Sequence, residues 1–196
     1  MRPVIAITMS AWFLLAVCSL GQRRGEPTYT ETTFDYSRDS TRVVLHIIER
    51  TQDMTIRAMT IYGDGRLDLE IRTGIETILA EYSRQISTAD MDRILRDAVD
   101  HGLVEWDNGR IHSLQLTSRA GRGYGPPEDS GNVTVLISLT EYRRGAYQLK
   151  DVERTIRVRG SEFAAEVFPE IVEFKGVNNL VARLNREFKE AEGKGE

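Results

Sequence analysis

Between residues 42 and 160 the chain alternates apolar and polar positions in several short runs. Residues 66–72, "RLDLEIR", place Leu67, Leu69 and Ile71 on one side and charged residues on the other, which is typical of a strand with one buried face. Residues 42–50, "RVVLHIIER", are apolar at both alternating positions and predict a central strand covered on two sides. Further strands are predicted at 55–63, 77–86, 132–142, 146–150 and 153–160.

The segment at 77–86, "TILAEYSRQI", has a helix as its alternative, because Ala, Leu and Glu favour helices. A Gly-Asp-Gly sequence at 63–65 separates two of the predicted strands. A phosphate loop would open into a helix, whereas a strand follows here. A calcium loop would need ligand side chains at alternate positions, which Gly65, Arg66 and Leu67 do not supply. Asp64-Gly65 tolerates positive φ, so we predict a hairpin turn.

Helical periodicity appears in three places. After Ser87, which can cap a helix together with Asp90, a stripe of apolar residues recurs every three or four positions until Gly102 can stop the helix. The stripe consists of Met91, Ile94, Leu95 and Ala98. A last helix at 177–191 has an equivalent stripe of Val177, Leu180, Val181, Leu184 and Phe188. Ser161 can cap a short helix that ends before Pro169.

Two segments have weaker patterns. Residues 103–116, "LVEWDNGRIHSLQL", predict a short strand or turn pair around 107–109. Residues 117–131, "TSRAGRGYGPPEDSG", predict a long surface loop, with a binding loop as the alternative. Because the strands are joined mainly by short turns, we predict an α+β fold: a mainly antiparallel sheet of about six or seven strands with helices packed on one face.

The N-terminus has the pattern of an export signal. Arg2 is followed by an apolar stretch at 4–17 and then by small residues, so cleavage after Gly21 is expected. A retained anchor is one alternative, although the apolar run is shorter than the roughly 20 residues that a membrane span needs. Lipid attachment at Cys18 is the other, because "LLAVC" resembles a bacterial lipoprotein signal; Val17 departs from the small residue expected before the cysteine.

We therefore expect a signal peptide at 1–21, a flexible polar tether at 22–41, one α+β domain at 42–191 and a disordered tail at 192–196. Part of the tether can be ordered, because Tyr29, Phe34 and Tyr36 can pack back on the domain. The expected location is periplasmic or extracellular, with a lipid-anchored envelope protein as the alternative. Cys18 is the single cysteine of the chain, so a chain cleaved after Gly21 has no disulfide, thiolate nucleophile or cysteine zinc ligand.

The net charge of −4 gives no support to nucleic-acid binding, which needs a basic surface. The chain has none of the HExxH, GxSxG, SxxK or Walker sequences. His46 is predicted to be a hydrogen-bonded core imidazole, and His101 to lie in the last turn of a helix. We predict no cofactor and no metal site; a metal at Asp100, His101 and Glu105 is disfavoured because their spacing does not fit one helical face.

Two classes of function remain open. In the first, a non-catalytic envelope or secreted domain binds a protein or glycan, with Tyr124 and Trp106 as expected contacts. In the second, a hydrolase assembles its site from dispersed residues, with His112, Asp107 and Glu105 as candidates. A pocket that gathers His112 with carboxylates would favour the enzyme.

The segment "TIYGDGRL", a following strand and "ISTADMDRILRDAVDHGL" together resemble a family of uncharacterised exported bacterial domains. That family has a Tyr-x-Asp-Gly hairpin followed by an Ile-Ser-capped helix. The resemblance covers about the central third of the chain, and implies export and the α+β fold without implying an activity.

Overall fold

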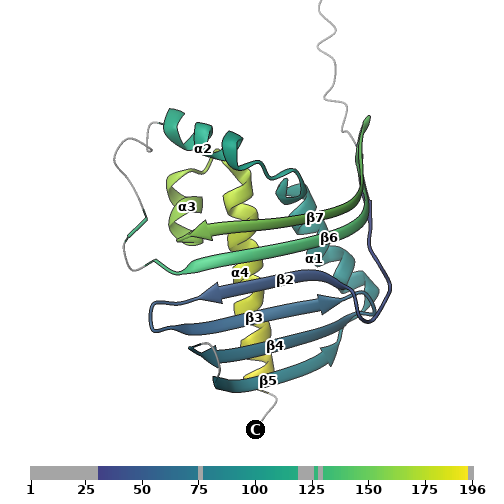
Figure 1. Ribbon diagram of the computed structural model, residues 1–196, viewed down its shortest axis with the longest axis vertical. Helices are drawn as coiled ribbons and strands as arrows, with labels where there is room; N and C mark the ends of the chain where they lie inside the picture. Colours follow the sequence, from purple (N-terminus) through teal and green to yellow (C-terminus); the bar gives the residue numbers. More distant parts are fainter. Residues whose placement is uncertain (1–30, 75–76, 119–125, 128–129, 194–196) are drawn as a thin grey trace, which may run out of the picture. The chain divides into compact units, whose positions relative to one another are not determined.

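One antiparallel sheet of seven strands dominates the computed structural model, which describes residues 31–74, 77–118, 126–127 and 130–193. The strands are β1 (Thr32–Asp35), β2 (Val43–Arg50), β3 (Thr55–Tyr62), β4 (Arg66–Thr73), β5 (Thr77–Gln85), β6 (Asn132–Arg144) and β7 (Tyr147–Arg159). They follow the order β1-β6-β2-β3-β4-β5, and β7 pairs with β6 (Figure 1). The long strand β6 therefore has β7 on one side, and β2 and then β1 on the other.

The helices are α1 (Thr88–Asp100), η1 (Leu103–Glu105), α2 (Asn108–Thr117), α3 (Ser161–Val167) and α4 (Val172–Glu192). Figure 1 shows α1 and α4 behind the sheet and α2 beyond the edge formed by β7. The predicted α+β class, with an antiparallel sheet and helices on one face, is confirmed. No helix among the described residues is long and apolar enough to span a membrane.

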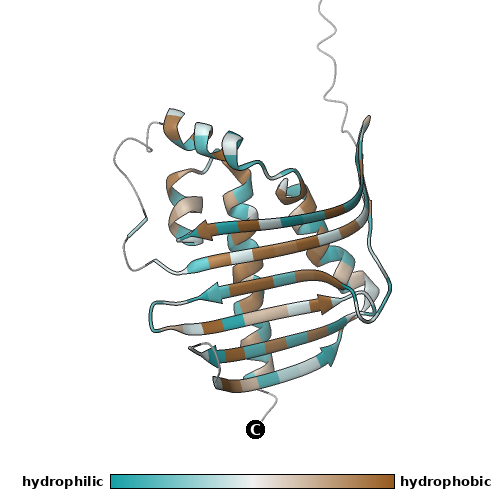
Figure 2. Ribbon diagram, viewed as in Figure 1, coloured by the Kyte–Doolittle hydropathy of each residue, from teal (hydrophilic) through white to brown (hydrophobic). Residues whose placement is uncertain are grey.

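The core lies between the sheet and the helices, where every second residue of the central strands points. Leu45 and Ile47 of β2 and Met59 and Ile61 of β3 are completely buried there. Figure 2 shows the resulting alternation of apolar and polar residues along the strands. All members of the two predicted helical stripes are buried, although α4 begins earlier than predicted, at Val172. The predicted caps of α1 are also confirmed: Ser87 Oγ accepts from Asp90 N–H, and Gly102 has a φ of 73°.

The turn at 63–65 and the strand at 77–86 agree with the sequence predictions. Gly65 has a φ of 87°, and Asp64 Oδ1 accepts a hydrogen bond of 3.0 Å from the Arg66 N–H. Residues Thr77–Gln85 form β5, the last strand at one edge of the sheet. The strands predicted separately at 146–150 and 153–160 are one continuous strand, β7, in which Asp151 has a φ of 49°.

The prediction of a strand or turn pair at 103–116 is wrong. The short helix η1 is followed by α2, and Asp107 caps α2 by accepting from the Arg110 N–H at 2.6 Å. An aspartate before Asn-Gly fits a helix start as well as a turn. The assignment of Ser161 as a cap is also wrong, because Gly160 holds the cap position with a left-handed φ of 58° and Ser161 is buried in the first turn.

The described part of the segment predicted as a tether at 22–41 belongs to the fold, and Phe34 and Tyr36 pack on the domain as their aromatic side chains allowed. Residues Thr32–Asp35 form β1, paired with the far end of β6, and Tyr36 is only 3 % exposed. The Tyr36 hydroxyl donates to Asp92 Oδ1 at 2.7 Å and accepts from Arg38. Since residues 31–196 cluster as one unit, the domain begins before residue 42.

The two faces of β2 differ, contrary to the prediction that both are covered. Leu45 and Ile47 are buried against the helices, whereas His46 and Ile48 on the opposite face are half-buried. The reason is that the helical layer packs on one face alone. Apolar side chains therefore remain on the face of the sheet that is open to solvent.

Candidate functional site

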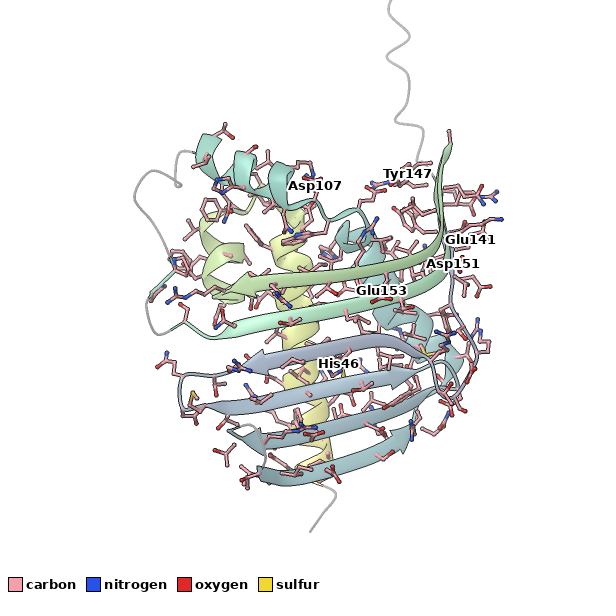
Figure 3. All side chains as sticks on the ribbon, viewed as in Figure 1. His46, Asp107, Glu141, Tyr147, Asp151 and Glu153 are labelled. Carbon is pink, nitrogen blue, oxygen red and sulfur yellow. The ribbon has the colours of Figure 1, made fainter. Side chains whose placement is uncertain are left out.

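A hollow of about 660 Å³ lies on this uncovered face; we call it the open-face groove. Its lining comes mainly from alternate residues of β2, β3, β4 and β5, together with Leu69 and Tyr82. The members on which the argument depends are His46, Ile48, Arg50, Ile56, Ala58, Thr60, Arg72 and Glu81. His46, on β2, lies near the middle of the sheet in Figure 3.

A row of polar side chains crosses the groove because strand register places them opposite one another. His46 pairs with Thr60, Thr60 with Asp68, and Asp68 with Ser83. His46 Nδ1 is 2.9 Å from Thr60 Oγ1, and Ser83 Oγ donates to Asp68 Oδ1 at 2.6 Å. The row thus consists of two hydrogen-bonded pairs that lie side by side.

The environment of His46 favours its neutral form. Burial lowers the pKa of the imidazole; a hydrogen bond with the Met59 backbone opposes this shift, and the positive charge of Arg72 adds to it. A neutral imidazole has one donor and one acceptor nitrogen, and Nδ1 is already engaged with Thr60. The prediction of a hydrogen-bonded imidazole is therefore confirmed, but its place is the half-buried open face and not the core.

Most charges in the groove are compensated by neighbours. The Arg66 guanidinium lies 3.9 Å from the centre of the Tyr62 ring and 3.7 Å from Asp68, and Arg72 Nη2 donates to Glu70 Oε2 at 2.6 Å. Arg50 of β2 and Glu81 of β5 differ: no ion pair joins either one to another described residue. Two uncompensated opposite charges therefore lie on the outer strands of the groove.

An apolar floor lies beside Arg50, and Glu70 and Arg72 of β4 lie between this floor and Glu81. Ile48, Ile56 and Ala58 are adjacent across β2 and β3, since Ile48 pairs with Ala58 and Ile56 pairs with Arg50. All three are half-buried. The strands β2 and β5 are three inter-strand spacings apart, or about 14 Å. The arrangement can accommodate an amphipathic ligand that crosses the strands and carries a charge at each end.

The structure does not gather the predicted hydrolase residues into one site. Glu105 accepts from the Tyr142 hydroxyl at 2.5 Å and from Arg144 at 3.1 Å, while Asp107 caps α2. His112, in the segment predicted as a strand or turn pair, is exposed on α2. These contacts give Glu105 and Asp107 structural roles.

His112 and Trp106 do share a second hollow, of about 260 Å³, between α2, α3 and the end of β7. We call it the α2 pocket. Trp106 is half-buried, packs edge-to-face on Phe174 at 5.9 Å and donates from Nε1 to Asn108 Oδ1 at 2.8 Å. No carboxylate residue lines this pocket in the part of the chain described. It therefore lacks the histidine–carboxylate combination expected of the hydrolase.

Three sequence predictions concern sites that the structure does not test. Cys18, Tyr124 and most of the loop at 117–131 lie outside the described residues.

His101 contacts Asp97, one helical turn earlier on α1. Its Nδ1 lies 2.7 Å from the Asp97 carbonyl oxygen and also near the Asp97 carboxylate. Among described residues no group of three His, Cys, Asp or Glu is placed to hold a metal ion.

Sequence reasoning did not identify the open-face groove. A signal was present, because Val44 and Ile48 are apolar at positions that alternate with Leu45 and Ile47. That excess of apolar residues indicated a second covered face, whereas in this fold Ile48 lies on the floor of a solvent-facing hollow and Val44, next to a register shift of β2, is buried in the core. No protein-family model and no curated protein matches the chain.

Proposed function

We propose that this chain is an exported, non-catalytic domain of the cell envelope, periplasmic or secreted, that binds a partner through the open-face groove. One observation carries the proposal. Half-buried apolar side chains share one hollow with two opposite charges, Arg50 and Glu81, that form no ion pair with another described residue, on the sheet face that none of the described helices covers. Apolar residues that retain partial exposure beside fixed polar groups are typical of binding sites.

The chemistry of the groove favours a polypeptide over a glycan as the partner. Sugar rings pack on free aromatic faces, but Arg66 covers the ring of Tyr62. Tyr82 also contributes to the lining of the groove, but it pairs with Leu69 of the core and is half-buried, so its ring is not a free face on the groove floor. Aliphatic residues flanked by one cation and one anion instead suit an extended segment of about four residues with a charge at each end.

The hydrolase alternative has weaker support. It needs a base and a positioned carboxylate that converge on a substrate. Glu105 and Asp107 are engaged in structural contacts, and His46 has a hydroxyl as its hydrogen-bond partner. Export rests on the pattern of the N-terminal segment, and lipid attachment through Cys18 would be compatible with the same binding role.

Site-specific photo-crosslinking in cells tests the proposal. A photo-reactive residue replaces Ala58, on the groove floor, or Ala182, exposed on α4, as the matched control. We expect one adduct in the envelope or secreted fraction from position 58, absent from position 182 and reduced by Glu81→Lys. Adducts of equal yield from both positions, or a chain found only in the cytosol, would refute the proposal.

A further inference from the structure

We propose that a further hollow, of about 360 Å³, binds a guanidinium cation. We call it the α3 pocket, because α3 forms one wall; the others are the end of β2 and the start of β6 with the two residues before it. Glu49 of β2 faces this pocket, whereas its neighbours Ile48 and Arg50 face the open-face groove on the other side of the sheet. The two sites are separate, so the proposal does not depend on the proposed function.

Two of the glutamates that line the α3 pocket come from α3 itself. Glu162 and Glu166 are exposed, one turn apart, and no ion pair joins either one to another described residue. Like charges four residues apart on a helix repel each other, and Glu166 also lies toward the C-terminal end, where the helix dipole disfavours an acid. The sequence of α3 has no basic residue to offset this repulsion. A bound cation would relieve it.

Glu49 adds a third carboxylate, which is fixed in place. Its side chain is 17 % exposed, and its Oε2 accepts a hydrogen bond of 2.6 Å from Arg57. A carboxylate has about four lone-pair sites, so Glu49 can accept a further hydrogen bond from a ligand. Because Arg57 compensates Glu49 alone, the charges of Glu162 and Glu166 remain to attract a cation.

Ser161 gives evidence for a ligand that is independent of the glutamates. It is 7 % exposed and lines the pocket, and its hydroxyl has no hydrogen-bond partner among the described residues. Buried polar groups are nearly always paired, because an unpaired one costs stability. A hydroxyl in the wall of an acidic hollow can accept a hydrogen bond from a cationic donor. Ser161 therefore marks a position at which a donor group of the ligand binds.

The spacing of these acceptors favours a guanidinium over a metal ion or a compact ammonium. Within the described part of the chain, the three glutamates are not placed closely enough to hold a metal ion. A guanidinium has five N–H donors in one plane, so it can bridge separated acceptors, and its face stacks on aromatic rings. Phe163, which is half-buried, supplies a ring at this pocket. The hollow can hold the group together with a short aliphatic chain.

NMR of the 15N-labelled full-length protein reads the α3 pocket through the backbone amides of Gly131 and Gly160, which lie in its wall. With butylguanidinium as the probe, we expect saturable shifts of both amides at millimolar concentrations, as the small size of this ligand predicts. Butylurea has the same number of non-hydrogen atoms but no charge, and should bind at least tenfold more weakly. Butylammonium should bind at least threefold more weakly, because its compact charge cannot bridge the acceptors.

Variants locate the site. Glu166→Gln should weaken butylguanidinium binding at least fivefold, whereas Glu190→Gln, which removes an exposed acid from α4, should leave it unchanged. Ser161→Ala should weaken binding about threefold. The melting temperature of Glu166→Gln should equal or exceed that of the parent, because the repulsion with Glu162 is removed.

A blocked Gly-Arg-Gly peptide separates two sources of the guanidinium group. Tighter binding than that of butylguanidinium would identify the ligand as an arginine side chain of a polypeptide, and weaker binding as a free small guanidinium compound. Equal affinity for butylguanidinium and butylurea, equal effects of Glu166→Gln and Glu190→Gln, or no saturable shift of the two glycine amides would overturn the proposal.

Discussion

Arg84 of the edge strand β5 forms an ion pair with Glu187 of α4, 103 residues further along the chain. Glu187 is 1 % exposed and also pairs with Arg183 at 2.6 Å. The charge on the inward side of β5 thus has a buried partner. The edge strand β5 therefore has two features that prevent a sheet edge from pairing with another chain. It has a charged residue that points inward, and its register against β4 shifts between Ile71 and Arg72.

Glu187→Ala should therefore destabilise the fold by about 3 kcal/mol, the lower end of the range for breaking a buried pair, because Arg84 remains partly hydrated. Glu190→Ala removes an acid that is half exposed and 4.0 Å from Arg84, and should cost at most about 0.5 kcal/mol. Urea unfolding monitored by circular dichroism measures both. Equal losses would contradict the role assigned to Glu187.

Tyr36→Phe tests whether the segment after β1 is part of the fold. The phenol donates to Asp92 on α1, and burial, followed by the hydrogen bond to Asp92, raises the pKa of Tyr36 to about 12. Losing this bond to a charged acceptor should cost about 1.5 kcal/mol in urea unfolding. Tyr147→Phe, at an exposed tyrosine of the β6–β7 hairpin, is the control and should change stability little. An unchanged unfolding midpoint for Tyr36→Phe would mean that this contact does not stabilise the domain.

The turn at 63–65 allows a comparison of neighbouring residues. A Cβ on Gly63 would lie 2.6 Å from the Asp39 carbonyl oxygen and nearer still to that of Ser37, so Gly63→Ala should cost about 2 kcal/mol or more. Asp64→Ala loses one exposed hydrogen bond, to the Arg66 N–H, and should cost about 0.5–1 kcal/mol with partner binding retained. A larger loss from Asp64→Ala, or lost binding in a folded Asp64→Ala protein, would refute the turn assignment.

His46 should make stability depend on pH in a defined direction. Because burial lowers its pKa in the folded state, the folded chain binds this proton less well than the unfolded chain. The stability that neutral His46 contributes is fully present above the unfolded pKa of about 6.5, and it is lost as the pH falls through the lower pKa of the folded state. His46→Gln should lose less stability than the parent between pH 7.5 and about pH 5 in thermal melts. His112→Gln is the control, and an identical pH dependence of parent and His46→Gln would contradict the prediction.

Local signals explain which parts of the fold could be predicted. The β3–β4 hairpin and α1 were recognised because Asp64-Gly65, Ser87 and Gly102 determine structure through their immediate neighbours. The helix α2 was missed because Ile111 is its single buried residue, which leaves no apolar period to detect. The strand β1 was missed because its pairing partner lies more than 100 residues away.

The candidate site was less predictable than the fold. Which face of β2 remains open depends on where α1 and α4 pack, and this is decided by contacts between distant segments. Arg50 and Glu81 are ordinary charged strand residues until the sheet places them at opposite sides of one hollow, with Ile56 and Ala58 beside Arg50 and Glu70 beside Glu81. Likewise, the sequence identified Gly63 as a turn residue but not its close approach to the backbone of residues 37–39, because that contact depends on where the N-terminal segment packs.

Calorimetric titration of the crosslinked partner, once identified, against two matched variants tests the open-face groove most directly. Ala58→Arg fills the groove without entering the core, while Ala182→Arg adds the same side chain to the exposed side of α4. The account predicts that Ala58→Arg weakens binding at least tenfold, or about 1.4 kcal/mol, and that Ala182→Arg leaves the affinity within twofold of the parent. Unchanged binding by a folded Ala58→Arg protein would contradict it.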